Sequence, residues 1–224
     1  MGFRRAAVNA FLKGVVNALC KIDSSGFFNV LSNNKPMILA VNHINFLEVP
    51  ILVAQSYPLY VTGMAKTETW KNPFFAFLFN TYQAIPIDRN KAFRGAFNQV
   101  RQAVDDGFFV AVFPEGTRSK DGVLGQGKAG IIHLALYADV PVLPVVHYGG
   151  ENIWKNIRRL RRTPFIFKAG RPFKIKCEGM PHKEVREEIL AEIMGQMARL
   201  LPVEMRGPYA LQAEQECKHL EFLE

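Results

Sequence analysis

A histidine and a carboxylate stand five residues apart in the segment Asn42–Glu48, which reads NHINFLE. The apolar run before it predicts a strand over Met37–Asn42, so His43 lies just past a strand end and Glu48 lies in the first turn of the next helix. A neutral imidazole in such a loop can take the proton of an attacking hydroxyl, while a carboxylate on its other nitrogen fixes the tautomer. The pair fits general-base catalysis without a metal or a bound cofactor, and a purely structural histidine would show the same spacing.

A second polar cluster, Phe113–Ser119 (FPEGTRS), follows the apolar run Phe108–Phe113. Its proline and glycine predict a rigid turn with exposed amides. The planar guanidinium of Arg118 suits phosphate oxygens. We interpret the run as an anion site, although a polar loop with a surface ion pair would explain any one of these residues alone.

Three further features stand at predicted strand ends. Ala84–Arg89 (AIPIDR) ends in a cation, Val140–Val145 (VPVLPV) begins a later strand, and Lys66 follows the strand predicted near Leu59–Thr62. Each of these features is uninformative by itself.

In order and spacing, the four blocks together resemble the PlsC-like family of glycerolipid acyltransferases, the lysophosphatidic acid acyltransferases. That family has a His-x4-Asp block, then an Ile-Pro-x-x-Arg-like block, a Phe-Pro-Glu-Gly-Thr-Arg-Ser block and a Val-Pro-Val-x-Pro-like block. The resemblance covers about residues 35–148, and Phe113–Ser119 is its most specific part.

The resemblance implies that His43 activates the hydroxyl of a lysophospholipid for direct attack on the thioester of an acyl donor, and that Glu48 holds and charge-balances His43. It also implies that Arg89 and Arg118 bind the acceptor phosphate. The remaining implied substrate-binding residues are those that shape the acceptor pocket and two lysines in looser matches, namely Glu115, Gly116, Thr117, Lys66 and Lys128.

One residue departs from the family pattern, since Glu48 stands where the family has Asp. The extra methylene moves the carboxylate by about one bond length, so either the loop adjusts or the role of the carboxylate weakens.

The product that the resemblance implies is phosphatidic acid, made from 1-acylglycerol-3-phosphate and an acyl-CoA or acyl carrier protein thioester. Another lysolipid or a glycolipid precursor fits Arg89 and Arg118 equally, and a non-catalytic lipid-binding protein is the second hypothesis.

Hydrophobic periodicity predicts alternating strands and helices, and therefore an α/β fold with a mostly parallel or mixed central sheet flanked by helices. The predicted strands are 37–42, 59–62, 84–87, 108–113, 140–147, 165–168 and 173–177. The predicted helices are an N-terminal amphipathic helix and those over 46–55, 72–82, 91–104, 127–137 and 182–200.

Residues 1–22 hold four cations and no acidic residue. Their apolar positions at helical spacing are Val8, Phe11, Leu12, Val15 and Leu19, opposite a polar row of Arg5, Asn9, Lys13, Asn17 and Lys21 that we expect to face solvent. Such a helix fits docking on an anionic bilayer, and it equally fits packing on the protein core. The aromatic helix near 72–82 leaves the same two interpretations open.

The net charge of +8 is concentrated, because residues 151–176 hold nine basic residues and one acidic residue. This segment fits leaflet phosphate, the phosphates of coenzyme A or an acidic acyl carrier protein. We expect no nucleic-acid partner, since no nucleic-acid-binding motif accompanies the basic patch.

With 224 residues, of which 49% are hydrophobic, the chain suits one compact domain. Its three cysteines form no Cys-x-x-Cys pair and are expected to be free thiols, with no metal site. No apolar run reaches the roughly 18 to 20 residues of a membrane span. We expect a peripheral or monotopic protein at the cytoplasmic face of a membrane, with a docking helix over 1–22, an acyltransferase domain over 23–202 and an acidic tail over 203–224.

Overall fold

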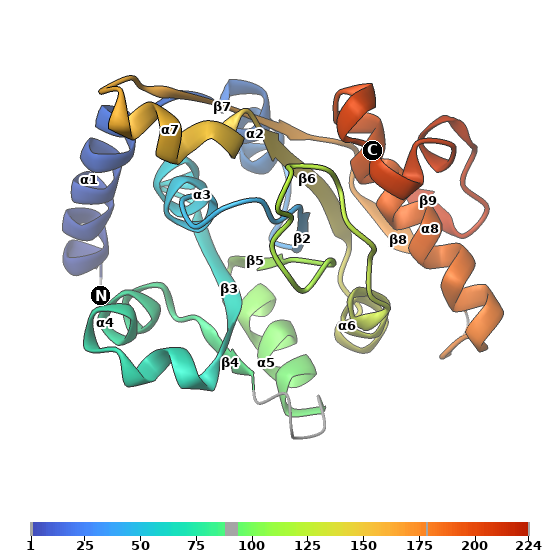
Figure 1. Cartoon of the computed structure of the whole chain (residues 1–224). Helices are drawn as coiled ribbons and strands as arrows, with labels where there is room; N and C mark the ends of the chain where they lie inside the picture. Colours follow the sequence, from blue (N-terminus) through green and yellow to red (C-terminus); the bar gives the residue numbers. More distant parts are fainter. Residues whose placement is uncertain (1, 88–93, 178, 224) are drawn as a thin grey trace.

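The computed structural model describes residues 2–87, 94–177 and 179–223 (Figure 1). Within these ranges the strands form one sheet of order β1-β7-β6-β2-β5-β3-β4, with β8 paired to β6 and β9 paired to β8. The strands are β1 (Cys20–Asp23), β2 (Ile38–Val41), β3 (Tyr60–Lys66), β4 (Ile85–Ile87), β5 (Phe108–Val112), β6 (Val142–Tyr148), β7 (Thr163–Ala169), β8 (Phe173–Ile175) and β9 (Leu220–Phe222).

The α-helices are α1 (Gly2–Leu19), α2 (Ser25–Ser32), α3 (Glu48–Ser56), α4 (Pro73–Tyr82), α5 (Arg94–Asp105), α6 (Gly130–Ala138), α7 (Ile153–Arg158) and α8 (Lys183–Leu200). Short 3-10 turns are η1 (Thr67–Lys71), η2 (Gly150–Asn152), η3 (Val203–Met205), η4 (Gly207–Tyr209) and η5 (Gln212–Glu214). Figure 1 shows helices on both sides of the strands, with α1 and α7 at the upper left and α6 and α8 at the right.

The centre of the sheet is parallel. β2 pairs in parallel with β5 and β6, and β3 with β4 and β5, whereas β7, β8 and β9 contribute antiparallel pairs. The predicted mixed α/β fold is thus confirmed. Because the carboxyl ends of parallel strands lie at one edge, His43 after β2, Pro114 after β5 and Lys66 at the end of β3 reach the same edge.

Each face of the sheet is covered by its own hydrophobic cluster. Ile38 and Ala40 of β2 belong to the cluster that includes α5, α6 and α8, whereas Leu39 and Val41 belong to the cluster with α1, α2 and α3. All four side chains are fully buried. Burial on both faces explains why the central strands are continuous apolar runs rather than alternating ones.

The strands and helices predicted between residues 37 and 200 are all present, with ends shifted by a few residues. Two strands and two α-helices were missed, namely β1, β9, α2 and α7. Three of them are only three to six residues long, and α2 follows a Ser-Ser-Gly sequence that indicates a turn. In segments this short, too few residues are present for hydrophobic periodicity to distinguish a strand or a helix from a loop.

The N-terminal helix α1 ends at Leu19, and residues 20–23 form the edge strand β1 beside β7. Val16 is buried in the cluster beneath α3, whereas Phe3 and Phe11 are 90% and 68% exposed. The prediction that Arg5 and Asn9 face solvent was wrong, because both side chains are buried.

The buried side chain of Arg5 joins α1 to the sheet. Its Nη2 donates to the carbonyl oxygen of Val61 at 3.0 Å, and its guanidinium lies 4.5 Å from the ring centroid of Tyr60 and 5.1 Å from those of Tyr82 and Phe108. Burial lowers the pKa of Arg5, while the neighbouring tyrosines oppose that shift. A cation that is hydrogen-bonded and enclosed by aromatic faces tolerates burial that would otherwise be costly.

The C-terminal segment 203–224, expected as an acidic tail, packs onto the domain over its described part. Tyr209, Ala213 and Leu220 are buried in the cluster beneath α8, and β9 pairs with β8. The segment is therefore anchored to the domain at these points, while other positions in it, such as Leu211, are exposed.

Replacing Arg5 with Ala is expected to lower the free energy of unfolding by about 1 to 3 kcal/mol, because the helix loses its hydrogen bond and three aromatic contacts. Urea unfolding of the wild type and the variant measures the difference. The matched control is Lys13→Ala, an exposed position on the same helix, which should change the free energy by less than about 0.5 kcal/mol. Equal losses in the two variants would contradict an anchoring role for Arg5.

Candidate active site

Two loops at the carboxyl edge of the sheet meet beside His43. The loop after β2 carries His43, and the loop after β5 carries Glu115 and Ser119. The amide of Ser119 donates to the carbonyl oxygen of His43 at 2.7 Å, and the amide of His43 donates to Oε1 of Glu115 at 2.8 Å. The first and second sequence clusters are therefore one structural unit.

His43 and Glu48 are in direct contact through Nδ1 of the imidazole and Oε1 of the carboxylate. The imidazole packs against Phe113, with ring centroids 4.5 Å apart. The side chain of His43 is 22% exposed, whereas that of Glu48 is 1% exposed. With its Nδ1 proton directed to the carboxylate, the imidazole keeps a lone pair on Nε2, which is the arrangement of a general base.

The second oxygen of Glu48 is held by the loop around it. Oε2 accepts hydrogen bonds from the amides of Ile44 at 2.9 Å and Asn45 at 3.1 Å, and Nε2 of His147 lies 2.9 Å away. Glu48 is also the first residue of α3, so the positive end of that helix lies beside its negative charge.

Burial alone would raise the pKa of Glu48, but the hydrogen bonds from His147 and His43 outweigh it and lower the pKa to about 2. The carboxyl group is therefore ionised at neutral pH in spite of its enclosure. An ionised carboxylate can only accept hydrogen bonds, which matches the donors around it.

Glu115 points into the protein rather than toward solvent. Its Oε1 accepts from the amide of His43, its Oε2 accepts from the amide of Gly125 at 2.8 Å, and its side chain is buried. Burial raises its pKa, and the two amide hydrogen bonds oppose that shift. In this arrangement Glu115 joins three segments of the site and fixes the backbone of His43.

Gly116 turns the loop with φ of +67°, a conformation that favours glycine. A Cβ atom at this position would lie 3.0 Å from Nζ of Lys128, so the stem of Lys128 crosses the loop there. Thr117 and Arg118 follow as exposed residues. The structure thus brings Lys128 and Arg118 to the loop that carries Glu115.

The other two predicted cations are placed differently. Lys66 is exposed at the end of β3, at the same edge of the sheet. Arg89 lies outside the described residues. The described ranges hold no group of three or more His, Cys, Asp or Glu side chains that could hold a metal ion.

From the sequence, His147 is only a spare candidate for the site, since it stands at a predicted strand end near Tyr148 and a single histidine there carries little information. It is fully buried near the end of β6, and its Nε2 lies beside Oε2 of Glu48, whereas His43 contacts Oε1. A hollow of about 300 Å³ lies between α6 and β8, and none of the predicted site residues lines it.

Known proteins are similar to this chain in sequence and in fold. A 1-acyl-sn-glycerol-3-phosphate acyltransferase of Limnanthes douglasii is 32% identical over 138 residues, which cover 60% of this chain and 49% of that protein. The chloroplastic 1-acyl-sn-glycerol-3-phosphate acyltransferase BAT2 of Brassica napus is 30% identical over 195 residues, covering 85% of this chain and 50% of the relative. The chain thus spans about half the length of these relatives.

The crystal structure of the 1-acyl-sn-glycerophosphate (LPA) acyltransferase PlsC from Thermotoga maritima superposes with a TM-score of 0.60 at 23% identity, over 84% of this chain and 76% of that one. This similarity supports the fold. The profile of the Acyltransferase family matches residues 26–148, which is more than half of the chain and includes all four sequence blocks. The chain therefore belongs to the Acyltransferase family, as the PlsC-like resemblance of its motifs predicted.

Proposed function

We propose that this protein transfers an acyl group from an acyl thioester to the free hydroxyl of 1-acylglycerol-3-phosphate, giving phosphatidic acid. The observation that carries the proposal is the contact of His43 with the buried, ionised Glu48 beside the loop of Arg118. The names of the related acyltransferases support the choice of acceptor. Acyl-CoA and acyl carrier protein thioesters are the two candidate donors.

In the proposed reaction, Nε2 of His43 takes the hydroxyl proton as the hydroxyl oxygen attacks the thioester carbonyl carbon. The tetrahedral intermediate collapses with cleavage of the C–S bond, and the leaving thiolate receives the proton from the imidazolium. Glu48 holds the imidazole and stabilises its charge in between. The ester and the free thiol are the products, and the enzyme forms no covalent intermediate.

The acceptor carries a phosphate, and the cations at the edge of the sheet suit it. Arg118 offers a planar pair of donors, and Lys128 lies across Gly116 in the same loop. We assign Arg118, Lys128 and Thr117 to the phosphate group, with the exposed Lys66 as a further cation at the same edge. The phosphate-binding role of Arg89 rests on the family resemblance alone, because Arg89 lies outside the described residues.

Purified protein should release free thiol from a long-chain acyl-CoA only when 1-acylglycerol-3-phosphate is present. His43→Ala should lower this release by about 100- to 10,000-fold, since a general base contributes that much. Thiol release is followed with a thiol-reactive dye, and the lipid product is separated by chromatography.

The matched control is His182→Ala, because His182 is exposed at the start of α8, away from Glu48. That variant should retain the wild-type rate. Release that persists in His43→Ala would contradict the proposed base. If acyl-CoA is inactive, acyl carrier protein thioesters and other lysolipids are tested in turn, and inactivity with all of them would favour the non-catalytic lipid-binding hypothesis.

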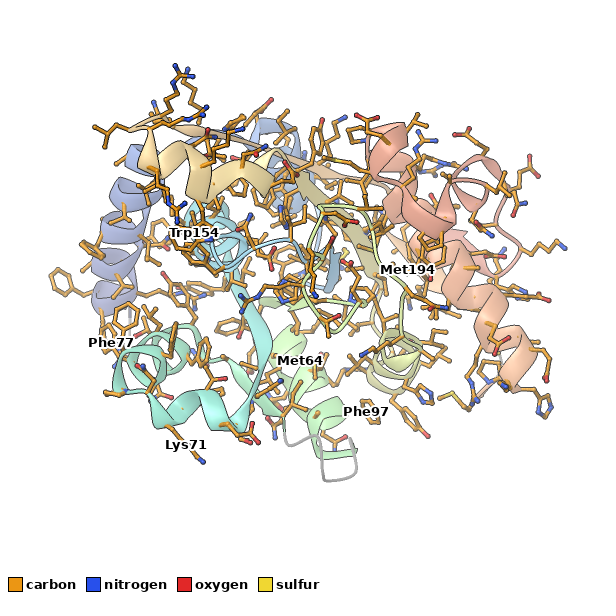
Figure 2. The ribbon with its side chains drawn as sticks, in the orientation of Figure 1. Met64, Lys71, Phe77, Phe97, Trp154 and Met194 are labelled. Atoms are coloured by element: carbon orange, nitrogen blue, oxygen red, sulfur yellow. The ribbon has the colours of Figure 1, made fainter. Side chains whose placement is uncertain are left out.

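We also propose peripheral docking on a lipid bilayer. The described part of the chain has no helix long and apolar enough to cross a membrane. An aromatic surface is instead exposed on two neighbouring helices, with Phe3 and Phe11 on α1 and Phe74 and Phe77 on α4. Figure 2 shows Phe77 at the side of α4 near α1, where the guanidinium of Arg4 lies 5.9 Å from its ring centroid.

A cationic segment lies at the other end of α1, away from α4. Arg158, Arg159 and Arg161 are exposed, and Arg162 donates to the carbonyl oxygen of Cys20 at 2.6 Å, which brings the segment to the end of α1. Trp154, labelled in Figure 2, is 60% exposed and stacks on Phe46, with ring centroids 5.0 Å apart. Phe46 follows His43 by three residues in the chain. Apolar rings beside cations are typical of an interface with anionic lipid.

The double variant Phe3→Ser/Phe11→Ser should weaken binding to vesicles of phosphatidylcholine with phosphatidylglycerol about tenfold or more, because two large apolar side chains leave the interface. Sedimentation with vesicles measures the bound fraction. Leu211→Ser is the control, since Leu211 is 77% exposed in the C-terminal segment, outside the aromatic surface. Unchanged binding of the double variant would mean that α1 only packs on the core.

A further inference from the structure

The side chain of His147 is fully buried, and its Nε2 lies beside two oxygen atoms that can only accept hydrogen bonds. Nε2 lies 2.9 Å from Oε2 of Glu48 and 3.0 Å from the carbonyl oxygen of Asn42. Neither oxygen carries a hydrogen, so Nε2 must carry the proton that is shared between them. The geometry therefore fixes the tautomer of His147 on its own.

The other nitrogen of His147 favours the neutral ring. Among the described residues Nδ1 is buried without a hydrogen-bond partner. In an imidazolium this atom would be a charged donor with nothing to accept from it, which is costly in a buried position. A neutral ring leaves only an unused lone pair there. His147 is thus a neutral donor to Glu48.

The backbone of His147 is held as firmly as its side chain. Its amide donates to Oδ1 of Asn42 at 2.8 Å, and Nδ2 of Asn42 donates to the carbonyl oxygen of His147 at 2.9 Å. Asn42 is buried and directly precedes His43. This reciprocal pair fixes the end of β6 against the end of β2, and so fixes the distance from His147 to Glu48.

We propose that His147 is a positioning residue of the acyl transfer, which holds Oε2 of Glu48 so that Oε1 stays directed at His43. A glutamate side chain has three rotatable bonds to restrain, and the amides of Ile44 and Asn45 restrain Oε2 from the loop side only. Nε2 of His147 restrains it from the sheet side. The inference rests on the proposed function, because positioning matters only if His43 acts as the base.

A matched pair of variants tests the donor itself. His147→Gln can present an N–H close to the position of Nε2, whereas His147→Met has a similar length and no donor. We expect His147→Gln to keep kcat within about fivefold of the wild type, and His147→Met to lower kcat about 10- to 100-fold with little change in KM for either substrate. The control is His219→Gln, because His219 pairs with Glu188 at 3.0 Å in the C-terminal region and should not affect kcat.

The same two variants in a Glu48→Gln background separate positioning from folding. If His147 acts through Glu48, His147→Met should cost less than about threefold once Glu48 has been replaced. An equal loss in both backgrounds, or equal losses for Met and Gln, would overturn the proposal in favour of a purely structural residue.

A measurement on the wild-type protein keeps the proposal testable if the Met variant does not fold or if no acyl transfer is found. Long-range ¹H–¹⁵N NMR of the histidine rings should show His147 as the neutral tautomer with its proton on Nε2, and Glu48→Gln should shift that nitrogen while leaving His219 unchanged. A proton on Nδ1, or no response to Glu48→Gln, would refute the inference. Inactivity together with the expected spectrum would instead count against the proposed function alone.

Discussion

The site depends on keeping one carboxylate ionised inside the protein. Glu48 is almost completely enclosed, and an isolated charge in such a place would be protonated. Four donors prevent this, namely two backbone amides and two imidazole N–H groups. Each donor imposes a requirement on the fold. The loop after β2 must curl around the start of α3 to supply its amides, and β6 must end beside β2 to supply the imidazole of His147.

These requirements explain the strand register and the backbone hydrogen bonds around the site. The parallel pairing of β2 with β6 has Val41 opposite Val145, and continuing that register places His147 beside His43. The reciprocal hydrogen bonds of Asn42 with the backbone of His147 maintain this register at the strand ends. Glu115 performs the corresponding role on the other side, since it ties the backbone of His43 to Gly125. The two loops and two strand ends therefore depend on one another.

Sequence patterns predicted the parts of this arrangement that are local. The continuous apolar runs of β2 and β5 follow from burial on both faces. His43 and Glu48 lie within one short segment of the chain, so spacing alone could find both. His147 could be found only as a histidine at a strand end, because its partner is 99 positions away in sequence and the pairing of β2 with β6 is a tertiary property. Likewise, Arg5 was assigned to solvent since periodicity cannot show that aromatic rings of three other segments enclose it.

The charges of Glu48, His43 and His147 also determine which state of the proposed reaction the site stabilises most. In the resting protein an anionic Glu48 contacts two imidazoles. The imidazole of His147, which we infer to be a neutral donor, is fully buried, whereas that of His43 is 22% exposed. When His43 accepts a proton in the proposed reaction, the buried carboxylate gains a cation in direct contact. The attraction between the two charges is strong because water is largely excluded from Glu48. It is absent while His43 is neutral, so this interaction stabilises the transition state more than the ground state. A neutral His147 is suited to this sequence of events, because it can restrain the carboxylate throughout without competing for the positive charge that forms on His43.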